Sequence, residues 1–205
     1  DPQERLRALS AYYGLISWMD HNVGLILAAL ETAGLTEDTT VVYSSDHGDN
    51  AGARGLWGKS NLYEESVAVP MIIAGPGIAQ GTCDTPVSLL DLSATIPDHF
   101  GVAFDCDGTP LPQIAQSPTQ PDREILSQYH AIGAVSGAYM LRCGRWKLNW
   151  YEGFEPELFD LVDDPDQPVN PATDPGCAAI PADMTPRLHR HPDPPATAAP
   201  PLRHT

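Results

Sequence analysis

Two neighbouring side chains that suit a metal ion are followed by a lysine that suits an anion. Asp46 and His47 come directly after the apolar run VVYSS, and Lys59 ends the glycine-rich loop GDNAGARGLWGK. A carboxylate and an imidazole that project together from the end of a strand form a natural pair of metal ligands. Gly48 lets the chain turn sharply beside them. Taken alone, the tripeptide Asp-His-Gly fits equally well a turn with a capping Asp and a packed His.

The charge balance of the chain narrows the class of ligand. The 205 residues carry a formal net charge of −16 and contain two lysines, Lys59 and Lys147. Such an acidic chain is a poor partner for nucleic acid, and no apolar run approaches the roughly 20 residues that span a bilayer. An anionic substrate would need locally concentrated positive charge, which a metal ion and a basic side chain would supply.

The cysteines and the first residues say little about function. Cys83, Cys106, Cys143 and Cys177 are widely spaced, without a Cys-x-x-Cys pair, so a cysteine-based zinc site is not expected. Whether they form disulfides is left open. The opening DPQERLRALS is typical of the start of a helix rather than of a natural N-terminus, which favours a fragment.

The elements that must position Asp46 and His47 follow from periodicity. Apolar residues at three- and four-residue steps predict a helix over residues 3–33, with Gly34 as its C-terminal cap. TTVVYSS predicts a buried parallel strand, and PMIIAGP a second short strand. VSLLDLSATI predicts another helix. This order indicates an α/β layered domain, which we assign to residues 1–122.

The rest of the chain has the pattern of an antiparallel sheet. EILSQYH predicts a strand, AYMLRCGRWKLNWY a hairpin with its turn near Cys143-Gly144-Arg145, and PELFDL a short extended segment. We therefore assign a small antiparallel subdomain to residues 123–164. Proline is dense in residues 165–205, which we expect to form a poorly ordered tail.

Several of these segments, taken together, resemble the sulfatase family of the alkaline-phosphatase-like superfamily. The resemblance runs from YYGLISWMDHNVGLILAALETAGLTEDT through VVYSSDHGD, GLWGKSNLYEESVAVPMIIAGPG and VSLLDLSATI, and resumes at YMLRCGRWKLNWY and ELFDLVDDP. It implies part of an alkaline-phosphatase-like three-layer sandwich with a small antiparallel C-terminal subdomain.

The resemblance also implies roles for individual residues. Asp46 and His47 match two ligands of a divalent metal, usually calcium, although the imidazole leaves manganese or zinc open. Lys59 matches the lysine that binds the sulfate and stabilises its charge during transfer. Glu64 matches a structural glutamate, and His130 matches a segment that contributes to the substrate pocket in some sulfatases.

Other parts of the family's site are not in this sequence. No cysteine or serine stands in the motif Cys/Ser-x-Pro-x-Arg, in which the family makes its formylglycine nucleophile, and the paired metal-binding aspartates are absent. In the family both features lie upstream of the matching helix. We therefore expect the chain alone to be inactive. Pro97 and Pro181 also stand where relatives more often carry leucine, and each is expected to interrupt a helix.

These observations predict a metal-dependent hydrolase of small sulfuric esters. A phosphonate or phosphate ester hydrolase on the same scaffold is the closest alternative, because sulfate and phosphate are similar tetrahedral oxyanions. An inactive truncated pseudoenzyme or an acidic calcium-binding module is a third. The sulfate ester, the compartment and the oligomeric state are left open.

Overall fold

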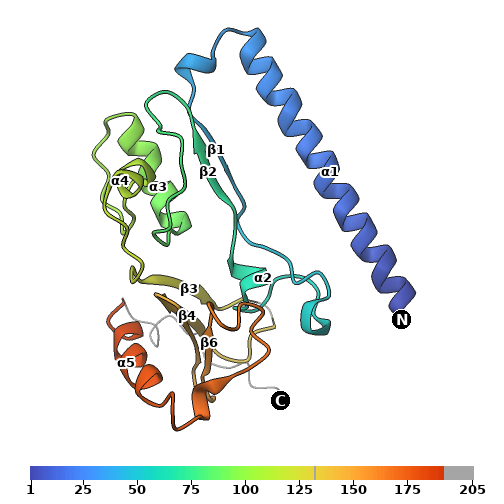
Figure 1. The fold of residues 1–205 in the computed structure, drawn as a ribbon, viewed down its shortest axis with the longest axis vertical. Coiled ribbons are helices and arrows are strands. Elements are labelled where there is room, and N and C mark those ends of the chain that lie inside the picture. The colour runs from blue at the N-terminus through green and yellow to red at the C-terminus, as the bar shows by residue number, and fades with distance from the viewer. Residues whose placement is uncertain (132, 192–205) are drawn as a thin grey trace. The chain divides into compact units, whose positions relative to one another are not determined.

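The chain folds into two units whose residues interleave along the sequence. The computed structural model describes residues 1–131 and 133–191. The first unit contains residues 1–59 and 68–81, and the second contains residues 60–67 and 82–205 (Figure 1). The predicted boundaries at 122 and 164 stay a prediction. Among the described helices, none combines the length and the apolar character that crossing a membrane requires.

The first unit opens with one long helix whose two ends are capped as the sequence predicts. Helix α1 (Pro2–Thr32) begins at Asp1, whose carboxylate accepts from the backbone N–H of Gln3 at 2.9 Å. Gly34 follows the helix with φ +69°, and the Leu35 N–H donates to the carbonyl of Leu30. This left-handed glycine cap satisfies the last carbonyls of the helix.

The strands of the first unit pair in the direction opposite to the one predicted. Strand β1 (Val41–Ser44) and strand β2 (Met71–Ala74) form an antiparallel ribbon in which Val41 faces Ala74 and Ser44 faces Met71. The prediction of a buried parallel strand was therefore wrong. A continuous apolar run shows that both faces of a strand favour burial, but it does not fix the direction of the neighbour. Two short 3₁₀ turns, η1 (Thr36–Asp38) and η2 (Ala53–Gly55), complete this unit.

The helical part of the second unit is held by a buried ion pair. Helix α3 (Leu89–His99) is capped by Ser88 and runs beside α4 (Leu111–Gln116). Asp91 on α3 is fully buried and accepts two hydrogen bonds from Arg123, at 2.8 and 2.6 Å. Burial alone would raise the pKa of Asp91, but the Arg123 guanidinium and the backbone N–H groups of Thr109 and Ser88 hold it below its ordinary value.

The sheet of the second unit has the predicted antiparallel pattern. Strands β3 (Ile125–Tyr129), β4 (Ala138–Cys143), β5 (Trp146–Tyr151) and β6 (Glu157–Asp160) are neighbours in that order. Gly144, with φ +58°, and Arg145 form the turn between β4 and β5. One face of the sheet packs on helix α5 (Ala179–Leu188), and the other face packs on Leu62, which precedes the short helix α2 (Glu64–Val67).

Neither proline interrupts its helix. Pro97 lies inside α3, which continues to His99, so the prediction of a break there was wrong. Pro181 is the third residue of α5, where the missing N–H is not needed by the helix, so that prediction was wrong too. Within the segment assigned to the tail, the structure places the 3₁₀ turn η3 (Pro171–Thr173) and α5, and residues 192–205 lie outside the described residues.

Candidate functional site

Asp46 and His47 lie directly after β1, and their side chains converge. The Ser45 hydroxyl donates to the carbonyl of His47 at 2.7 Å, and the His47 N–H donates to Asp46 Oδ1 at 3.0 Å. These bonds tighten the turn, so that His47 Nε2 and Asp46 Oδ2 come within 3.4 Å of each other. The Asp46 side chain is 83% exposed and that of His47 37% exposed. The pair is therefore open to an incoming ion or ligand.

The hydrogen bonds of His47 fix which ring nitrogen carries the lone pair. Nδ1 lies 2.9 Å from the carbonyl oxygen of Gly48, and a carbonyl oxygen only accepts, so Nδ1 is the donor. In the neutral ring this leaves the lone pair on Nε2. The ammonium of Lys59 lies 2.5 Å from that atom and donates to it. Asp46, His47 and Lys59, the three residues selected from the sequence, are thus brought together.

Two residues that the sequence analysis did not select close the loop between His47 and Lys59. Asp49 Oδ1 accepts from the N–H of Ala51 at 2.7 Å and from the N–H of Gly58 at 3.3 Å. Asn50 donates to the carbonyl of Gly58 from its backbone and from its side chain, at 2.8 and 2.5 Å. These bonds hold Gly58 next to the start of the loop and so return Lys59 to His47. The sequence offered one signal for these two residues, because Asp49 and Asn50 directly follow the Asp-His-Gly tripeptide.

Backbone conformations within the loop explain its glycines. Gly52 has φ +85°, and a Cβ there would lie 3.2 Å from the Trp57 ring and 3.3 Å from the Arg5 guanidinium. Glycine therefore relieves both the left-handed backbone and the close approach of Trp57. Arg54, in the same loop, is exposed and has a left-handed backbone with φ +53°.

The donor atoms present fit a divalent metal ion in part. In a six-coordinate ion with bonds of about 2.3 Å, neighbouring ligand atoms lie roughly 3.3 Å apart. The 3.4 Å separation of Asp46 Oδ2 and His47 Nε2 matches this value. Across residues 1–131 and 133–191, no group of three or more Asp, Glu, His or Cys side chains gathers around one point. Within this described part, Asp46 and His47 are the two candidate ligands that lie together.

The remaining predicted residues belong to the second unit. His130 Nε2 lies 3.2 Å from the Gln128 amide oxygen, and its ring packs edge-on against Tyr139 at a centroid distance of 5.0 Å. Its assignment to a substrate pocket stays a prediction. Glu64 pairs with Lys147 at 2.6 Å, and its N–H donates to the Gln167 side chain at 2.9 Å, consistent with the structural role expected for it. All four cysteines are free thiols.

Comparison with protein families decides the membership of the chain. The sulfatase model matches residues 1–102, and the model for the C-terminal part of N-sulphoglucosamine sulphohydrolase matches residues 52–193. The chain belongs to the sulfatase family. The resemblance stated from the sequence is thereby confirmed.

Individual sulfatases give the same result. The chain is 37% identical to a choline-sulfatase of Rhizobium meliloti (strain 1021) over 175 residues, which cover 82% of the chain and 34% of that protein. It is 35% identical to arylsulfatase K of Mus musculus, with 80% of the chain and 32% of that protein covered. The chain thus spans about a third of the length of these relatives.

Solved structures confirm the fold class. A 2-O GAG sulfatase matches 84% of the chain and 40% of its own length, with a TM-score of 0.75 and 31% identity. The phosphonate monoester hydrolase of Agrobacterium radiobacter matches 87% of the chain and 40% of its own length, with a TM-score of 0.74 and 26% identity. The chain therefore has part of the alkaline-phosphatase-like fold.

Proposed function

We propose that the sulfatase to which this chain belongs hydrolyses small sulfuric esters, and that Asp46, His47 and Lys59 form the chain's share of its active site. The convergence of these three side chains after β1 is the observation that supports the proposal, because an oxyanion and its metal need this combination of charges at one place.

Each residue has a distinct role in this proposal. Asp46 Oδ2 and His47 Nε2 would hold a divalent metal, calcium by preference, while the Nδ1 bond to Gly48 keeps the Nε2 lone pair directed toward it. A bound metal would neutralise charge on the sulfuryl group and on its attacking oxygen. Lys59 would bind a sulfate oxygen, and the Asp49 and Asn50 bonds to Gly58 would keep its ammonium in place.

A substitution of Lys59 tests this assignment. The Lys59→Ala variant, made in a polypeptide of the relatives' full length that contains this chain, is expected to lower kcat/KM for an aryl sulfate by about 10²- to 10³-fold, because one cation on the transferring group is lost. Arg54→Ala removes a positive charge from the same loop and serves as the matched control, with activity within about threefold of the unsubstituted enzyme. Full activity of Lys59→Ala would refute the role of Lys59.

A phosphonate ester hydrolase is the second candidate, supported by the match to phosphonate monoester hydrolases with TM-scores of 0.74 and 0.75. The three side chains suit either oxyanion. Rates on an aryl sulfate and on the matched aryl methylphosphonate, measured on the same preparation, separate the two. A higher kcat/KM for the phosphonate would replace the sulfatase assignment.

A further inference from the structure

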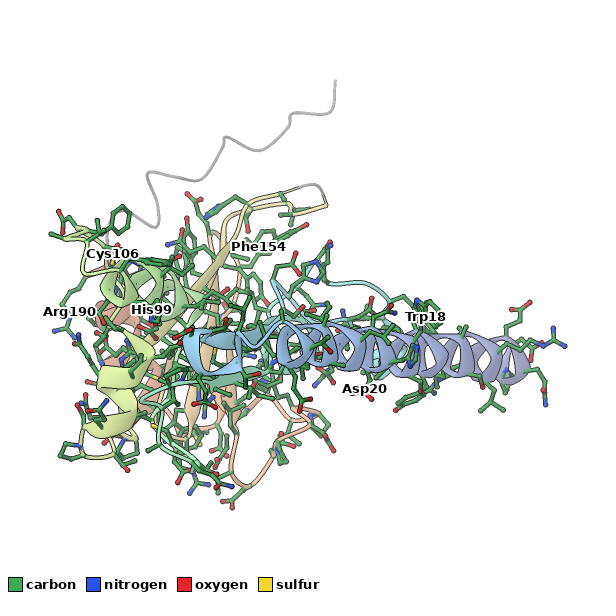
Figure 2. The ribbon with its side chains drawn as sticks, turned by 90° about the horizontal axis from the view of Figure 1, so that it is seen from above. Trp18, Asp20, His99, Cys106, Phe154 and Arg190 are labelled. Atoms are coloured by element: carbon green, nitrogen blue, oxygen red, sulfur yellow. The ribbon has the colours of Figure 1, made fainter. Side chains whose placement is uncertain are left out.

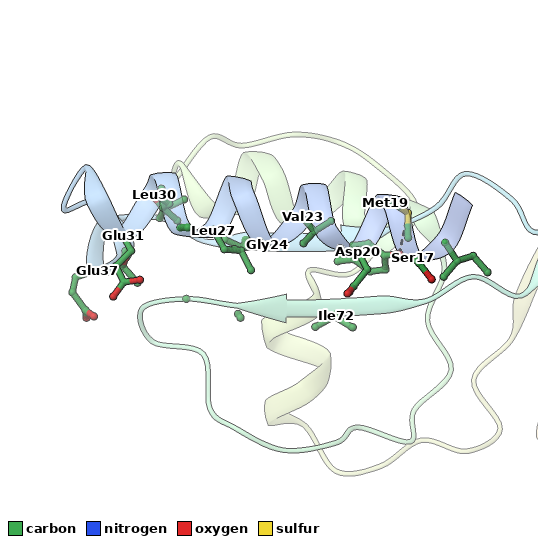
Figure 3. A pocket seen from close by; sticks show the side chains of 18 residues that line it. Ser17, Met19, Asp20, Val23, Gly24, Leu27, Leu30, Glu31, Glu37 and Ile72 are labelled. Carbon is green, nitrogen blue, oxygen red and sulfur yellow. Dashed lines mark hydrogen bonds between the residues drawn. The ribbon is translucent and has the colours of Figure 1, made fainter. Parts of the chain in front are cut away.

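The open surfaces of the first unit do not identify a ligand. A groove lies between α1 and the β1–β2 ribbon, lined by Val23 and Leu27 of the helix and by Ile72 of β2 (Figure 3). Trp18 and Asp20, on opposite sides of the same helix, are both exposed (Figure 2). Because the chain spans about a third of the length of its relatives, the rest of such a polypeptide accounts for these open surfaces. A new site is better sought among groups that the chain buries by itself.

A connected polar network lies in the second unit, between strands β5 and β6 and the segment that leads into α2. Glu157 on β6 accepts from the hydroxyls of Tyr63 and Tyr151, at 2.8 and 2.7 Å. Its neighbour across the strands, Asn149, donates to the same carboxylate from the side-chain amide at 3.4 Å. Burial and the Glu157 carboxylate raise the pKa of Tyr151, so its hydroxyl keeps the proton that it donates.

The same network extends from Asn149 to Gln167. Lys147 lies two residues before Asn149 on β5, so the two side chains are on the same face of the sheet. The Lys147 ammonium donates to Glu64 at 2.6 Å, and the Glu64 backbone N–H donates to the Gln167 amide oxygen at 2.9 Å. Gln167 has a left-handed backbone with φ +56°, which residues other than glycine rarely adopt. Its buried amide is thus held in place on an uncommon backbone conformation.

Two atoms of this network, Asn149 Oδ1 and Gln167 Nε2, have no hydrogen-bond partner among the described residues. Asn149 is 0% exposed and Gln167 3% exposed, so the chain itself shields both from bulk solvent. Turning either amide over would not help. The Asn149 oxygen would then face the Glu157 carboxylate, and the Gln167 amide nitrogen would face the N–H of Glu64. Because an unsatisfied buried polar atom is costly, each of the two atoms is expected to have a ligand.

The chemistry of these two atoms selects a small neutral ligand. One atom is an acceptor and the other a donor, so the ligand must donate to the first and accept from the second. A cation would meet the Lys147 ammonium, and an anion would meet the carboxylates of Glu64 and Glu157. Water has both hydrogen-bonding functions without charge, and a buried water typically makes about three such bonds.

We propose that this network binds internal water, which donates to Asn149 Oδ1 and accepts from Gln167 Nε2. The water links strand β5 to the segment that contains Gln167, and so completes the contacts between the sheet and that segment. It belongs to the folded second unit and takes no part in the hydrolysis of an ester. The proposal therefore does not depend on the sulfatase activity proposed above.

Two measurements on the chain test for this water. In a crystal structure at atomic resolution, we expect density for water within about 3.2 Å of Asn149 Oδ1 and of Gln167 Nε2. In solution, magnetic relaxation dispersion of the water oxygen counts the internal waters that exchange slowly. This count should fall by at least one in the Asn149→Leu variant, because leucine offers the water no acceptor.

The stability of Asn149→Leu gives a result whose sign depends on the water. With water bound, leucine expels it and leaves Gln167 Nε2 unsatisfied, so the melting temperature is expected to fall by at least about 3 °C. Without a ligand, leucine removes an unsatisfied buried acceptor, and the melting temperature would rise. Gln128→Leu replaces an exposed amide on β3 of the same sheet and is the matched control, with a shift of less than about 2 °C.

Three results would overturn the proposal. The first is an atomic-resolution structure in which either atom bonds to a protein group, to an ion or to nothing at all. The second is an unchanged count of internal waters in Asn149→Leu. The third is a higher melting temperature of that variant. The crystal structure uses the unsubstituted chain, so it decides the question even if Asn149→Leu does not fold.

Discussion

Two partners would compete for the lone pair of His47 Nε2, the Lys59 ammonium and a metal ion. In this structure Lys59 donates to it at 2.5 Å, and the same atom is the proposed metal ligand. A nitrogen lone pair serves one partner at a time, so binding of a metal requires the ammonium to move off the ring. Lys59 would then be available for a substrate oxygen. On the proposed assignment, metal binding and release of the lysine would be coupled through one atom.

Removing the competing ammonium should strengthen metal binding by this chain. We expect Lys59→Met to raise the affinity for Mn²⁺ by about 3- to 10-fold, because the lone pair is released and a nearby positive charge is removed. Asp46→Asn should lower the affinity by a similar factor or more. Isothermal titration calorimetry measures both, with Arg54→Met as a control for the loss of one charge. Weaker binding by Lys59→Met would contradict the competition.

The ion pair of Asp91 with Arg123 should make the second unit sensitive to acid. The folded chain holds the pKa of Asp91 below its ordinary value of 3.8, so the pair stabilises the fold above that pH and this contribution is lost as the pH falls through the folded value. Asp91→Asn should cost about 3 kcal/mol at pH 7. Urea unfolding at pH 7 and at pH 3 checks this. A cost that is equal at both pH values would be inconsistent with the pair.

Residue type and spacing drew attention to Asp46, His47 and Lys59, and the resemblance to sulfatases gave them their expected roles. These signals were not enough to find Asp49 and Asn50. Both hold Gly58 across eight or nine residues of chain. Asx side chains also serve in local turns and caps, and the sequence does not show which backbone group they will reach.

At the scale of elements, Pro97 and Pro181 differ in what they cost their helices. Pro97 lies in the interior of α3, where its missing N–H removes one helical hydrogen bond, and Pro181 lies in the first turn of α5, where none is lost. We expect Pro97→Ala to raise the free energy of unfolding by about 1–2 kcal/mol. Pro181→Ala should change it by less than about 0.5 kcal/mol. Thermal denaturation of both variants measures the difference, and equal shifts would refute it.

The helices and strands also show which features of the fold could be predicted from the sequence and which could not. Local sequence signals were sufficient where the interacting residues are close in sequence. Gly34 correctly predicted the end of α1, and Gly144–Arg145 correctly predicted the turn of the β4–β5 hairpin. Local signals were insufficient for β1, because its neighbour β2 lies beyond the long loop, and that connection allows either direction. Proline was misjudged because its cost depends on its position within the helix, which the sequence locates only to a few residues.

For the molecule as a whole, one buried pair joins distant parts of the second unit. Lys147 on β5 is fully buried and pairs with Glu64, 83 residues earlier in the chain. Lys147→Met is expected to cost about 3–5 kcal/mol, because the Glu64 carboxylate loses its cation. The double variant Glu64→Gln with Lys147→Met should cost less than the sum of the single changes. Urea unfolding measures this, with Lys59→Met as the exposed lysine control; additive costs would argue against the pair.

The interleaving of the two units has a consequence for how such a protein can change over evolution. Residues 60–67 belong to the second unit, but the segments on both sides of them belong to the first. Neither unit is therefore encoded by one uninterrupted stretch of gene. A single crossover between two related genes cannot exchange one unit cleanly, and it would separate Glu64 from its matching Lys147 if it fell between their codons. We expect these two positions to be inherited together, so that natural recombinants in the family avoid joining them from different parents.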